Sequence, residues 1–455
     1  MKPKDSKILI VSYHFPPDAE VGGIRAAKFA KYLPDFGWKP YVLTVKDEYY
    51  KAKDYGRLKE VEGATIVRTS MWPTVLGAAL KARRLILRPF RSRSGKGESA
   101  PSVHAPPGQG GPAATQRSNL KRHLDSIFEL PDKWVGWTIP AVWAGFWLIR
   151  KERIPVVFTT SPVPTAALVG FILAKLTGAR LVTDLRDIWF LHEGKAPWIR
   201  SKFSDAVDRW LERKIASRSS KVICVTEHHT AYMRERFRDP TQNRFVTIFN
   251  GFDGADFKVA NGIPGVSDRF VLSYLGTFYN QRSPREFLQA MGQLVREQVI
   301  PKEKVEIRFI GDVREADGRP VEELVAENGL EKCVRVQDKI PHRESIGEMK
   351  RAVVLLLFAP QQFFMIPAKA FEYLWAKREI LCFAEDGATA DLIRRTGGGV
   401  VVDPRNVDAI KQAVKDFYFS WETGGNPVYK CDISIFDRRE LTRQLSELLV
   451  EVVAH

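Results

Sequence analysis

The sequence is poor in cysteine and has no closely spaced cysteine pair. Its 455 residues include only Cys224, Cys333, Cys382 and Cys431, and no two of them form a CxxC motif. This spacing argues against a disulfide framework and against a zinc site, and it favours a reducing compartment such as the cytosol. Cys224 and Cys382 lie inside apolar runs, so we expect both of them in the hydrophobic core.

Long hydrophobic runs are also lacking. The two most apolar windows, residues 139–149 and 166–176, are well short of the roughly 20 apolar residues that a membrane-spanning helix needs. The opening residues 1–4 lead directly into a predicted strand, a pattern that does not resemble a signal peptide. We therefore expect a cytoplasmic protein without a transmembrane segment.

Acidic residues are outnumbered by basic ones. Lys plus Arg number 70 and Asp plus Glu number 54, which gives a formal net charge of +16. The hydrophobic fraction of 44% and the charged fraction of 27% are those of a globular protein with two or three domains. The basic excess favours an anionic partner, which is a polyanion, an anionic membrane surface or an anionic small substrate.

Apolar strands alternate with helical patterns along most of the chain, which is typical of α/β folds with parallel sheets. The pattern predicts two Rossmann-like domains that face a cleft, within residues 1–258 and 265–430. A C-terminal helix within 431–455 is expected to pack back on the first domain. From about 88 to 120 the composition is rich in Ser, Gly and Pro, which predicts a flexible insertion.

The first strand, residues 7–12, leads through a long loop to Gly22-Gly23 and then to a helix that starts at about Ile24. Strand, glycine loop and helix is the layout of phosphate-binding folds, but the loop lacks GxGxxG. The glycines could simply form the turn, or they could let the backbone approach a ligand. Arg25, in the first helical turn, is expected to meet negative charge there.

A second βαβ unit lies in the last hundred residues. Its predicted strands are 352–358 and 379–383, and its helix starts just after Pro367. The N-terminus of a helix attracts anions, and Lys369 adds a positive charge in the first turn. Glu372 is placed on the same face, where it could accept hydrogen bonds from sugar hydroxyls. The alternative is an ordinary helix with a solvated lysine and a capping glutamate.

Two other segments suggest contact with a membrane. Residues 134–151 carry four tryptophans and a phenylalanine and end in basic residues, as an interfacial helix does. A core helix with an exposed aromatic edge is the other interpretation, and we favour it. Residues 81–96 hold seven basic residues and no acid. We interpret them as a solvated linker, with contact to anionic lipid as the alternative.

Six motifs, in this order and spacing, resemble the family 4 (group 1) nucleotide-sugar glycosyltransferases, which have the GT-B architecture. They cover nearly the whole chain except the insertion. The motifs are YHFPPDAEVGGIRAAKFAKYLPDFGW from residue 13, TDLRDIW from 183, FNGFD from 249, YLGTFYNQRSP from 274, FIGD from 309 and PAKAFEYLWAKREIL from 367.

The resemblance implies roles for individual residues. Glu372 matches the second glutamate of the family's E-x7-E motif, which typically binds the donor ribose, whereas Phe364 replaces the first. Asp187 in the RDxW motif and His14 are the catalytic candidates. Together with the strand-end residues, the expected donor-binding set is Gly22, Gly23, Arg25, Gly276, Thr277, Arg282, Lys369 and Glu372.

The expected activity is therefore transfer of a sugar from a nucleotide-sugar donor to a lipid-linked or surface-polysaccharide acceptor. The resemblance implies a retaining reaction. The sequence shows no convincing DxD pair, so we expect neither a metal nor another cofactor. The expected location is the cytoplasm, with peripheral binding to the inner face of the membrane and no nucleic-acid partner. A nucleotide-sugar epimerase of the same fold and a polyanion-binding protein are the alternatives.

Overall fold

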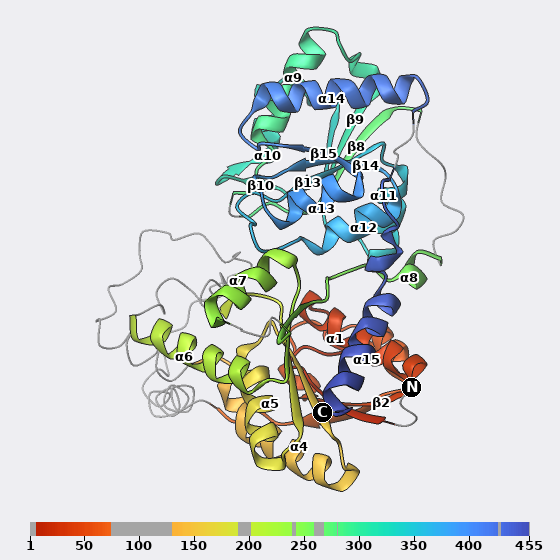
Figure 1. Cartoon of the computed structure of the whole chain (residues 1–455). Helices are drawn as coiled ribbons and strands as arrows, with labels where there is room; N and C mark the ends of the chain where they lie inside the picture. Colours follow the sequence, from red (N-terminus) through yellow and green to blue (C-terminus); the bar gives the residue numbers. More distant parts are fainter. Residues whose placement is uncertain are drawn as a thin grey trace, which may run out of the picture. The chain divides into compact units, whose positions relative to one another are not determined.

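The computed structural model describes residues 6–73, 130–189, 202–238, 243–258, 268–279, 281–425 and 429–454. The chain divides into two compact units, each built around its own sheet (Figure 1). Unit 1 comprises Met1–Ile223, Phe237–Val246 and Ser446–His455, and unit 2 comprises Cys224–Arg236 and Thr247–Leu445. The predicted insertion at 88–120 and the basic stretch at 81–96 lie outside the described residues.

Unit 1 is organised around a seven-stranded sheet in the order β3-β2-β1-β4-β5-β6-β7. The strands are β1 (Ser6–Val11), β2 (Trp38–Val45), β3 (Thr65–Thr69), β4 (Val156–Thr160), β5 (Arg180–Leu185), β6 (Lys221–Cys224) and β7 (Phe245–Thr247). β1 pairs in parallel with both β2 and β4. These central strands are almost continuous apolar runs, as expected where helices cover both faces of a parallel sheet. The last residues of β6 and β7 belong to unit 2.

The first helix of unit 1 begins at Ile24, as predicted. Unit 1 contains α1 (Ile24–Tyr32), the 3₁₀ turn η2 (Leu33–Phe36), α4 (Thr138–Glu152), α5 (Pro164–Thr177) and α6 (Lys202–Arg218). Gly37 ends the first helical segment with a φ of 83°, a left-handed cap that glycine adopts without strain. α5 packs against both α4 and α6 (Figure 1).

Helix α4 buries one narrow stripe of residues and exposes large apolar residues on the opposite side. Ala141, Gly145 and Ile149 are buried, and a Cβ atom on Gly145 would lie only 2.7 Å from Leu173 of α5. The large residues spaced by four along the other face have exposed fractions between 55% and 68%: Ile139, Trp143 and Trp147. The close approach of α4 to α5 therefore leaves an aromatic stripe in contact with solvent.

Unit 2 contains a six-stranded parallel sheet in the order β12-β9-β8-β13-β14-β15. The strands are β8 (Phe270–Thr277), β9 (Val305–Asp312), β12 (Val334–Gln337), β13 (Val354–Phe358), β14 (Glu379–Phe383) and β15 (Gly399–Val402). A short antiparallel pair, β10 (Glu315–Ala316) with β11 (Arg319–Pro320), follows β9. Cys382 in β14, like Cys224 in β6, is fully buried as predicted.

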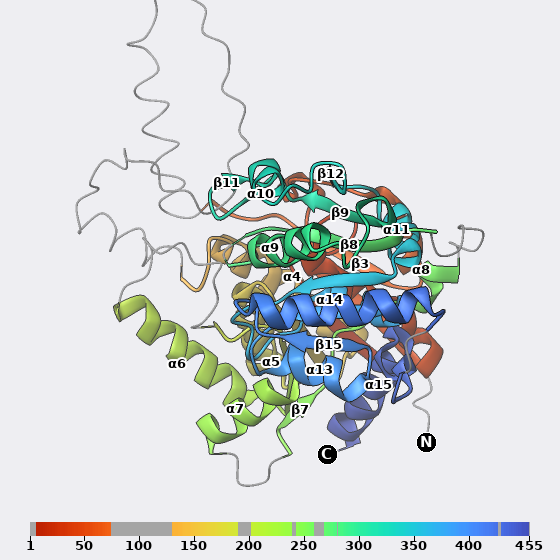
Figure 2. The same cartoon turned by 90° about the horizontal axis from the view of Figure 1, so that it is seen from above.

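Helices cover both faces of this second sheet. α9 (Arg285–Arg296), α10 (Val321–Glu327) and α14 (Val407–Glu422) bury one face, and α9 and α14 lie side by side (Figure 2). α11 (His342–Arg351), α12 (Ala368–Ala376) and α13 (Ala388–Thr396) bury the other face. Two further helices, α7 (Glu227–Phe237) and α8 (Gly254–Lys258), precede the strands of this sheet in the sequence. Two doubly wound α/β sheets confirm the predicted fold class.

The final helix, α15 (Arg438–Ala454), begins in unit 2 and ends in unit 1. Its last turns belong to the first sheet's unit, where the buried indole N–H of Trp38 donates to the hydroxyl of Ser446 at 3.0 Å. Lys221 at the start of β6 pairs with Glu451 at 2.6 Å. Among the helices that the structure describes, none has the length and apolar character required to cross a bilayer.

Candidate functional site

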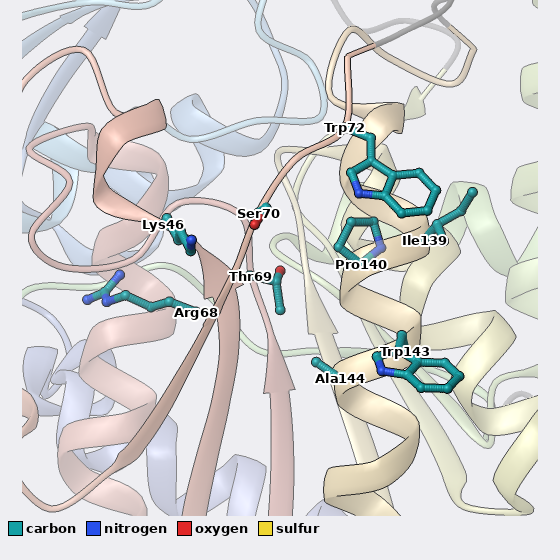
Figure 3. A pocket seen from close by; sticks show the side chains of 9 residues that line it. All are labelled: Lys46, Arg68, Thr69, Ser70, Trp72, Ile139, Pro140, Trp143 and Ala144. Carbon is teal, nitrogen blue, oxygen red and sulfur yellow. The ribbon is translucent and has the colours of Figure 1, made fainter.

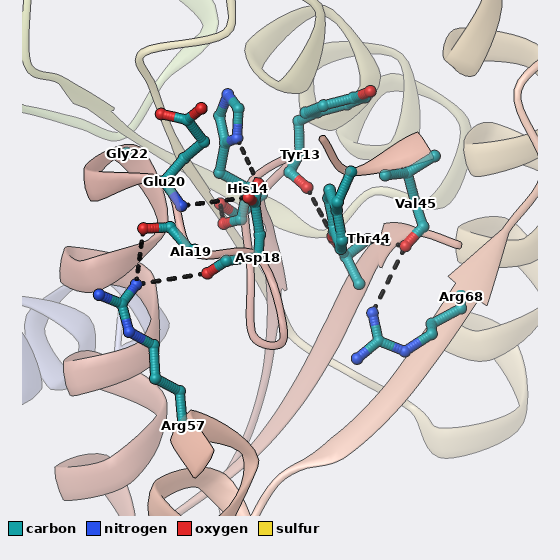
Figure 4. Close-up of polar contacts among 12 residues, drawn as sticks. Tyr13, His14, Asp18, Ala19, Glu20, Gly22, Thr44, Val45, Arg57 and Arg68 are labelled. Atoms are coloured by element: carbon teal, nitrogen blue, oxygen red, sulfur yellow. Dashed lines mark hydrogen bonds and ion pairs between the residues drawn. The ribbon is translucent and has the colours of Figure 1, made fainter. Parts of the chain in front are cut away.

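The loop after β1 carries His14, and its ring is held by a carboxylate (Figure 4). His14 Nδ1 lies 2.6 Å from Asp18 Oδ2, and the second oxygen of Asp18 accepts from the backbone N–H of Glu20 at 3.1 Å. The ring also meets Trp134 edge-on at 5.9 Å between centroids. A carboxylate at Nδ1 favours the tautomer with a proton on that nitrogen, which leaves Nε2 able to accept a proton.

The two glycines predicted for a ligand loop pack against this histidine. A Cβ atom on Gly22 would lie 3.2 Å from the His14 ring, and one on Gly23 would lie 3.1 Å from the His14 carbonyl. The carbonyl of Gly22 accepts a hydrogen bond from the guanidinium of Arg186 at 2.7 Å. Burial lowers the pKa of Arg186, although Asp187 and Asp184 oppose that change. The two glycines therefore allow their segment to pack closely against His14. Their contact with a ligand stays a prediction.

Arg25, in the first turn of α1, points into the interior of unit 1. Its side chain is 1% exposed and forms a bidentate pair with Asp184 at the end of β5, with distances of 2.9 and 3.0 Å. Asp184 is fully buried and also accepts from the hydroxyl of Thr160 at 2.7 Å. A guanidinium that is buried and paired in this way ties α1 to the sheet, and its contact with a donor stays a prediction.

Asp187 follows Arg186 beyond the end of β5 and is half-buried. Its carboxylate makes no hydrogen bond to any residue within the described ranges, although residues 190–201 after it are not among them. The role of Asp187 as the acid that the RDxW motif suggests stays a prediction. The structure places it one residue from the arginine that holds the glycine loop.

Unit 1 also contains a groove of about 500 Å³ between the ends of β2 and β3 and helix α4 (Figure 3). Lys46 and Arg68 lie at one side of it, and Trp72, Ile139 and Trp143 form the other side. The indole of buried Trp137 donates to the hydroxyl of Thr69 at 2.7 Å, which fixes the start of α4 to the end of β3. The groove therefore combines a cationic end with an aromatic wall.

The two cations of the groove differ in their partners. Arg68 donates to the carbonyl of Pro16 at 2.6 Å and pairs with Asp47 at 2.9 Å, so it links the groove to the His14 loop. Figure 4 shows its longer contact with the carbonyl of Val45. Lys46 is exposed, and the described part of the chain provides no acid within ion-pair distance of it. Within the described residues, Lys46 thus brings a positive charge without an ion-pair partner to this site.

In unit 2 the strand ends Gly276 and Gly311 lie next to each other in register. Gly311 has a φ of 130°, and a Cβ atom on it would overlap the carbonyl oxygen of Gly276. Only glycine allows this approach, so the backbone carries no side chain at these two paired positions. We call Gly276 and Gly311 the bare edge. Tyr274 donates its hydroxyl proton to the carbonyl of Thr277 at 2.9 Å, which fixes the chain beyond β8.

Helix α12 begins directly after Pro367, as predicted, and two of its charged side chains form a group with a histidine of α11. Lys369 Nζ lies 2.7 Å from Glu372 Oε2, and His342 Nε2 at the start of α11 lies 3.3 Å from Glu372 Oε1. Burial by itself would raise the pKa of Glu372, but Lys369 and His342 outweigh it and lower the pKa to about 2. The carboxylate is therefore ionised at neutral pH.

This group is attached to the end of β8 by the next residue of α12. The buried hydroxyl of Tyr373 accepts a hydrogen bond from the backbone N–H of Leu275 at 3.0 Å. This hydrogen bond therefore links helix α12, which carries Glu372, to strand β8, which carries Gly276. Arg282 follows β8, lies over the ring of Tyr279 at 4.4 Å and has no acidic partner among the residues described.

Phe364 occupies the position of the family's first glutamate and has a structural role. Its carbonyl accepts from the hydroxyl of Thr226 at 2.7 Å, and its ring packs against Tyr232 of α7 at 5.2 Å. The neighbouring Phe363 is 50% exposed and packs edge-on against His228 at 5.0 Å. An aromatic surface therefore stands where the motif would place a carboxylate.

Sequence reasoning missed the partners of the predicted residues more than the residues themselves. His342 is the clearest case, because it opens α11 directly after a proline in the same way that α12 opens after Pro367. That shared pattern was a usable signal. Asp18 and His14 stand four residues apart in one loop, which was a weaker one. Nothing in the sequence joined Arg186 to the carbonyl of Gly22.

Two sequence profiles of known protein families together match most of the chain. The sequence profile described as "Glycosyl transferase 4-like domain" matches residues 22–248, and the profile described as "Glycosyl transferases group 1" matches residues 269–418. No curated protein sequence matches the chain.

Several solved structures share the fold along the whole length. Sucrose-phosphate synthase from Thermosynechococcus elongatus has a TM-score of 0.60 at 16% identity, with 99% of each chain covered. HepE from Anabaena in complex with UDP has a TM-score of 0.59 at 14% identity, with 98% of this chain and 100% of that chain covered. A further structure of HepE contains UDP-glucose, with a TM-score of 0.56 at 16% identity and coverage of 98% and 99%. At these identities the likeness shows the fold alone.

Proposed function

The chain belongs to the group 1 glycosyltransferases, and from this membership we propose that it transfers a sugar from a nucleoside-diphosphate-sugar donor to a lipid-linked acceptor. Membership makes the chain a glycosyltransferase, so the epimerase considered from the sequence is not retained. The observation that carries the donor half is the ionised Glu372 between Lys369 and His342 at the start of α12.

Unit 2 supplies the groups that a nucleoside diphosphate needs. Glu372 is acceptor-only when ionised, so it suits the two hydroxyls of a ribose. The first backbone N–H groups of α12 have no partner within the helix, and Lys369 adds charge beside them, which suits a diphosphate. The complexes of HepE with UDP and UDP-glucose support a donor of this class.

The reaction places new negative charge on the departing diphosphate. The bond between the anomeric carbon and the diphosphate oxygen breaks, and its electron pair stays on that oxygen. We propose that Lys369 and Arg282, together with the helix N-terminus, stabilise this charge without a metal ion. We further propose retention of configuration, which rests on the family membership.

Unit 1 supplies the acceptor side. The groove offers Lys46 for a phosphate and the aromatic wall of Trp72 and Trp143 for an apolar chain, which suits a lipid-linked acceptor better than a free polysaccharide. As the acceptor hydroxyl bonds to the anomeric carbon, its proton passes to Nε2 of His14. Asp18 then stabilises the imidazolium that forms.

The first experiment is a thermal-shift panel of UDP, GDP, ADP and NAD on the wild-type protein and on Glu372→Ala. A stabilising shift with one nucleoside diphosphate that shrinks in the variant is expected. Glu344→Ala is the matched control, because Glu344 is an exposed acid in the first turn of α11. A shift with NAD alone, or an equal loss in both variants, would contradict the donor site.

A further inference from the structure

Helix α6 separates its charges by sign. Among its residues Asp208 and Glu212 are buried, together with Ser204, Ile215 and Ala216. Its five cations are exposed, and they are Lys202, Arg209, Arg213, Lys214 and Arg218; the third acid, Asp205, is half-buried. A typical solvated helix mixes both signs on its outer face, so this one presents an unusual surface.

Two large aromatic residues lie among these cations. Phe203 is 52% exposed and Trp210 is 57% exposed. They are seven residues apart, which is two helical turns, so they point in nearly the same direction. Arg209 and Arg213 lie to one side of this direction and Lys214 to the other. We call these six residues, Lys202, Phe203, Arg209, Trp210, Arg213 and Lys214, the basic–aromatic face.

The four cations of this face have no acidic partner among the residues that the structure describes. Both views show α6 at the outside of its unit (Figures 1 and 2). The face therefore exposes four positive charges and two apolar rings on a straight segment of 17 residues.

We propose that the basic–aromatic face of α6 binds the surface of a membrane that contains anionic lipid. Interfacial helices combine these same features, because their cations meet lipid phosphates while their aromatic rings enter the headgroup layer. Nucleic acid is the other polyanion that fits the charge. However, single-stranded nucleic acid is held in grooves with stacking platforms, whereas this face is the convex side of one helix.

The proposal extends the proposed function, since a lipid-linked acceptor lies in a membrane, but it rests on different residues from the donor site and the acceptor groove. It also identifies a segment other than the two that the sequence indicated. The aromatic helix α4 lines the acceptor groove, and the basic stretch at 81–96 is not among the described residues.

The test is flotation of the full chain with vesicles of phosphatidylcholine alone and with vesicles that also contain phosphatidylglycerol. The wild-type protein should float only with the anionic vesicles. Each cation near such a surface contributes about fivefold to binding. We therefore expect the triple variant Arg209→Glu, Arg213→Glu, Lys214→Glu to lose flotation, and Phe203→Ser with Trp210→Ser to weaken it by about tenfold or more.

A matched control carries the same change in net charge elsewhere: Lys51→Glu, Lys332→Glu, Lys339→Glu, at three exposed lysines. This variant should float like the wild type. Equal loss in both triple variants would overturn the proposal, because it would show a response to net charge alone. So would absence of wild-type flotation, or binding of duplex or single-stranded DNA through the same arginines without binding to vesicles.

The nucleoside-diphosphate thermal shift separates this proposal from the proposed function. The α6 triple variant should keep the wild-type shift, because its substitutions are remote from Glu372 and Lys369 in sequence and lie in the other unit. A lost shift in the wild type would contradict the donor site alone. Lost flotation with an intact shift in the wild type would contradict the membrane surface alone.

Discussion

The strand ends of the two units use charge in opposite ways. In unit 1 the arginines are bound inside the protein, where Arg25 is paired with Asp184 and Arg186 donates to the carbonyl of Gly22. In unit 2 the charged groups remain partly exposed, with Lys369 at 32% and Glu372 at 20%. The first arrangement fixes a backbone, and the second holds ions where a ligand can reach them.

This difference shows that a charged residue at a strand end is not by itself a ligand contact. What separates the two cases is whether the protein already satisfies the charge. A bidentate pair with no exposed surface would lose its geometry if a ligand replaced one partner, whereas a half-exposed pair such as Lys369 with Glu372 can exchange its partners for a ligand. The following predictions test this contrast, from the largest expected effect to the smallest.

Arg25→Met should break the internal arrangement of unit 1. It leaves the carboxylate of Asp184 buried beside the hydroxyl of Thr160 alone, and we expect the free energy of unfolding to fall by about 3–5 kcal/mol. Urea denaturation measures this change. The double variant Arg25→Met, Asp184→Leu should regain most of the loss, because it removes both charges. A loss below about 1 kcal/mol in the single variant would mean that the pair is not structural.

Gly311→Ala should damage the bare edge of unit 2. The new Cβ atom would overlap the carbonyl of Gly276 at a φ of 130°, so we expect a destabilisation of about 3 kcal/mol and loss of the nucleotide-induced thermal shift. Gly318→Ala is the control. Gly318 also has a positive φ, 73°, but open space around it, and its substitution should cost about 1 kcal/mol and keep the shift. Equal effects would rule out the steric explanation.

His14→Gln should lower turnover by about 100-fold, which corresponds to the usual contribution of a general base. Asp18→Asn should lower it less, because the histidine keeps its place but loses the carboxylate that stabilises its charged form. KM for the donor should change little in both variants, since neither substitution removes a group that the proposal assigns to donor binding. Steady-state kinetics with a saturating donor measures the effect. Unchanged turnover in His14→Gln would remove His14 from the reaction.

Glu372→Gln should change stability in a pH-dependent manner. The pKa of Glu372 is lowered to about 2 in the folded protein, against about 4.3 in an unfolded chain. Its ionised form therefore stabilises the fold fully above about pH 5, and this contribution is lost as the pH falls from about 4 toward 2. The difference in urea midpoint between wild type and variant should be present in full at about pH 5 and vanish near pH 2. A difference that persists at low pH would have another cause.

Much of the fold could be predicted from the sequence because its signals are local. The strand predicted at residues 379–383 and the helix after Pro367 are found at those positions, since apolar runs and proline boundaries act through neighbouring residues. The domain boundaries at 1–258, 265–430 and 431–455 stay predictions. They depend on how distant segments associate, and α15 shows that one helix can belong to two units.

The site could be predicted less completely, for a physical reason. Burial decides whether a charged side chain serves the fold or a ligand, and burial depends on residues that are distant in the sequence. Arg25 is separated from Asp184 by 159 positions, and His342 from Glu372 by 30. Lys369 and Glu372, which interact within one helical turn, were the pair that sequence reasoning could find.

The hydrogen bond between Trp38 and Ser446 has a consequence for the order of events during synthesis. The two residues belong to the same unit but are 408 positions apart, and nearly the whole of unit 2 lies between them. During synthesis on the ribosome, the indole of Trp38 therefore cannot bind Ser446 until the second sheet has emerged. A chain released before Ser446 would contain a complete second sheet but a first sheet whose Trp38 lacks its acceptor. Loss of the last turns of α15 should thus expose Trp38, which is among the first residues to be synthesised.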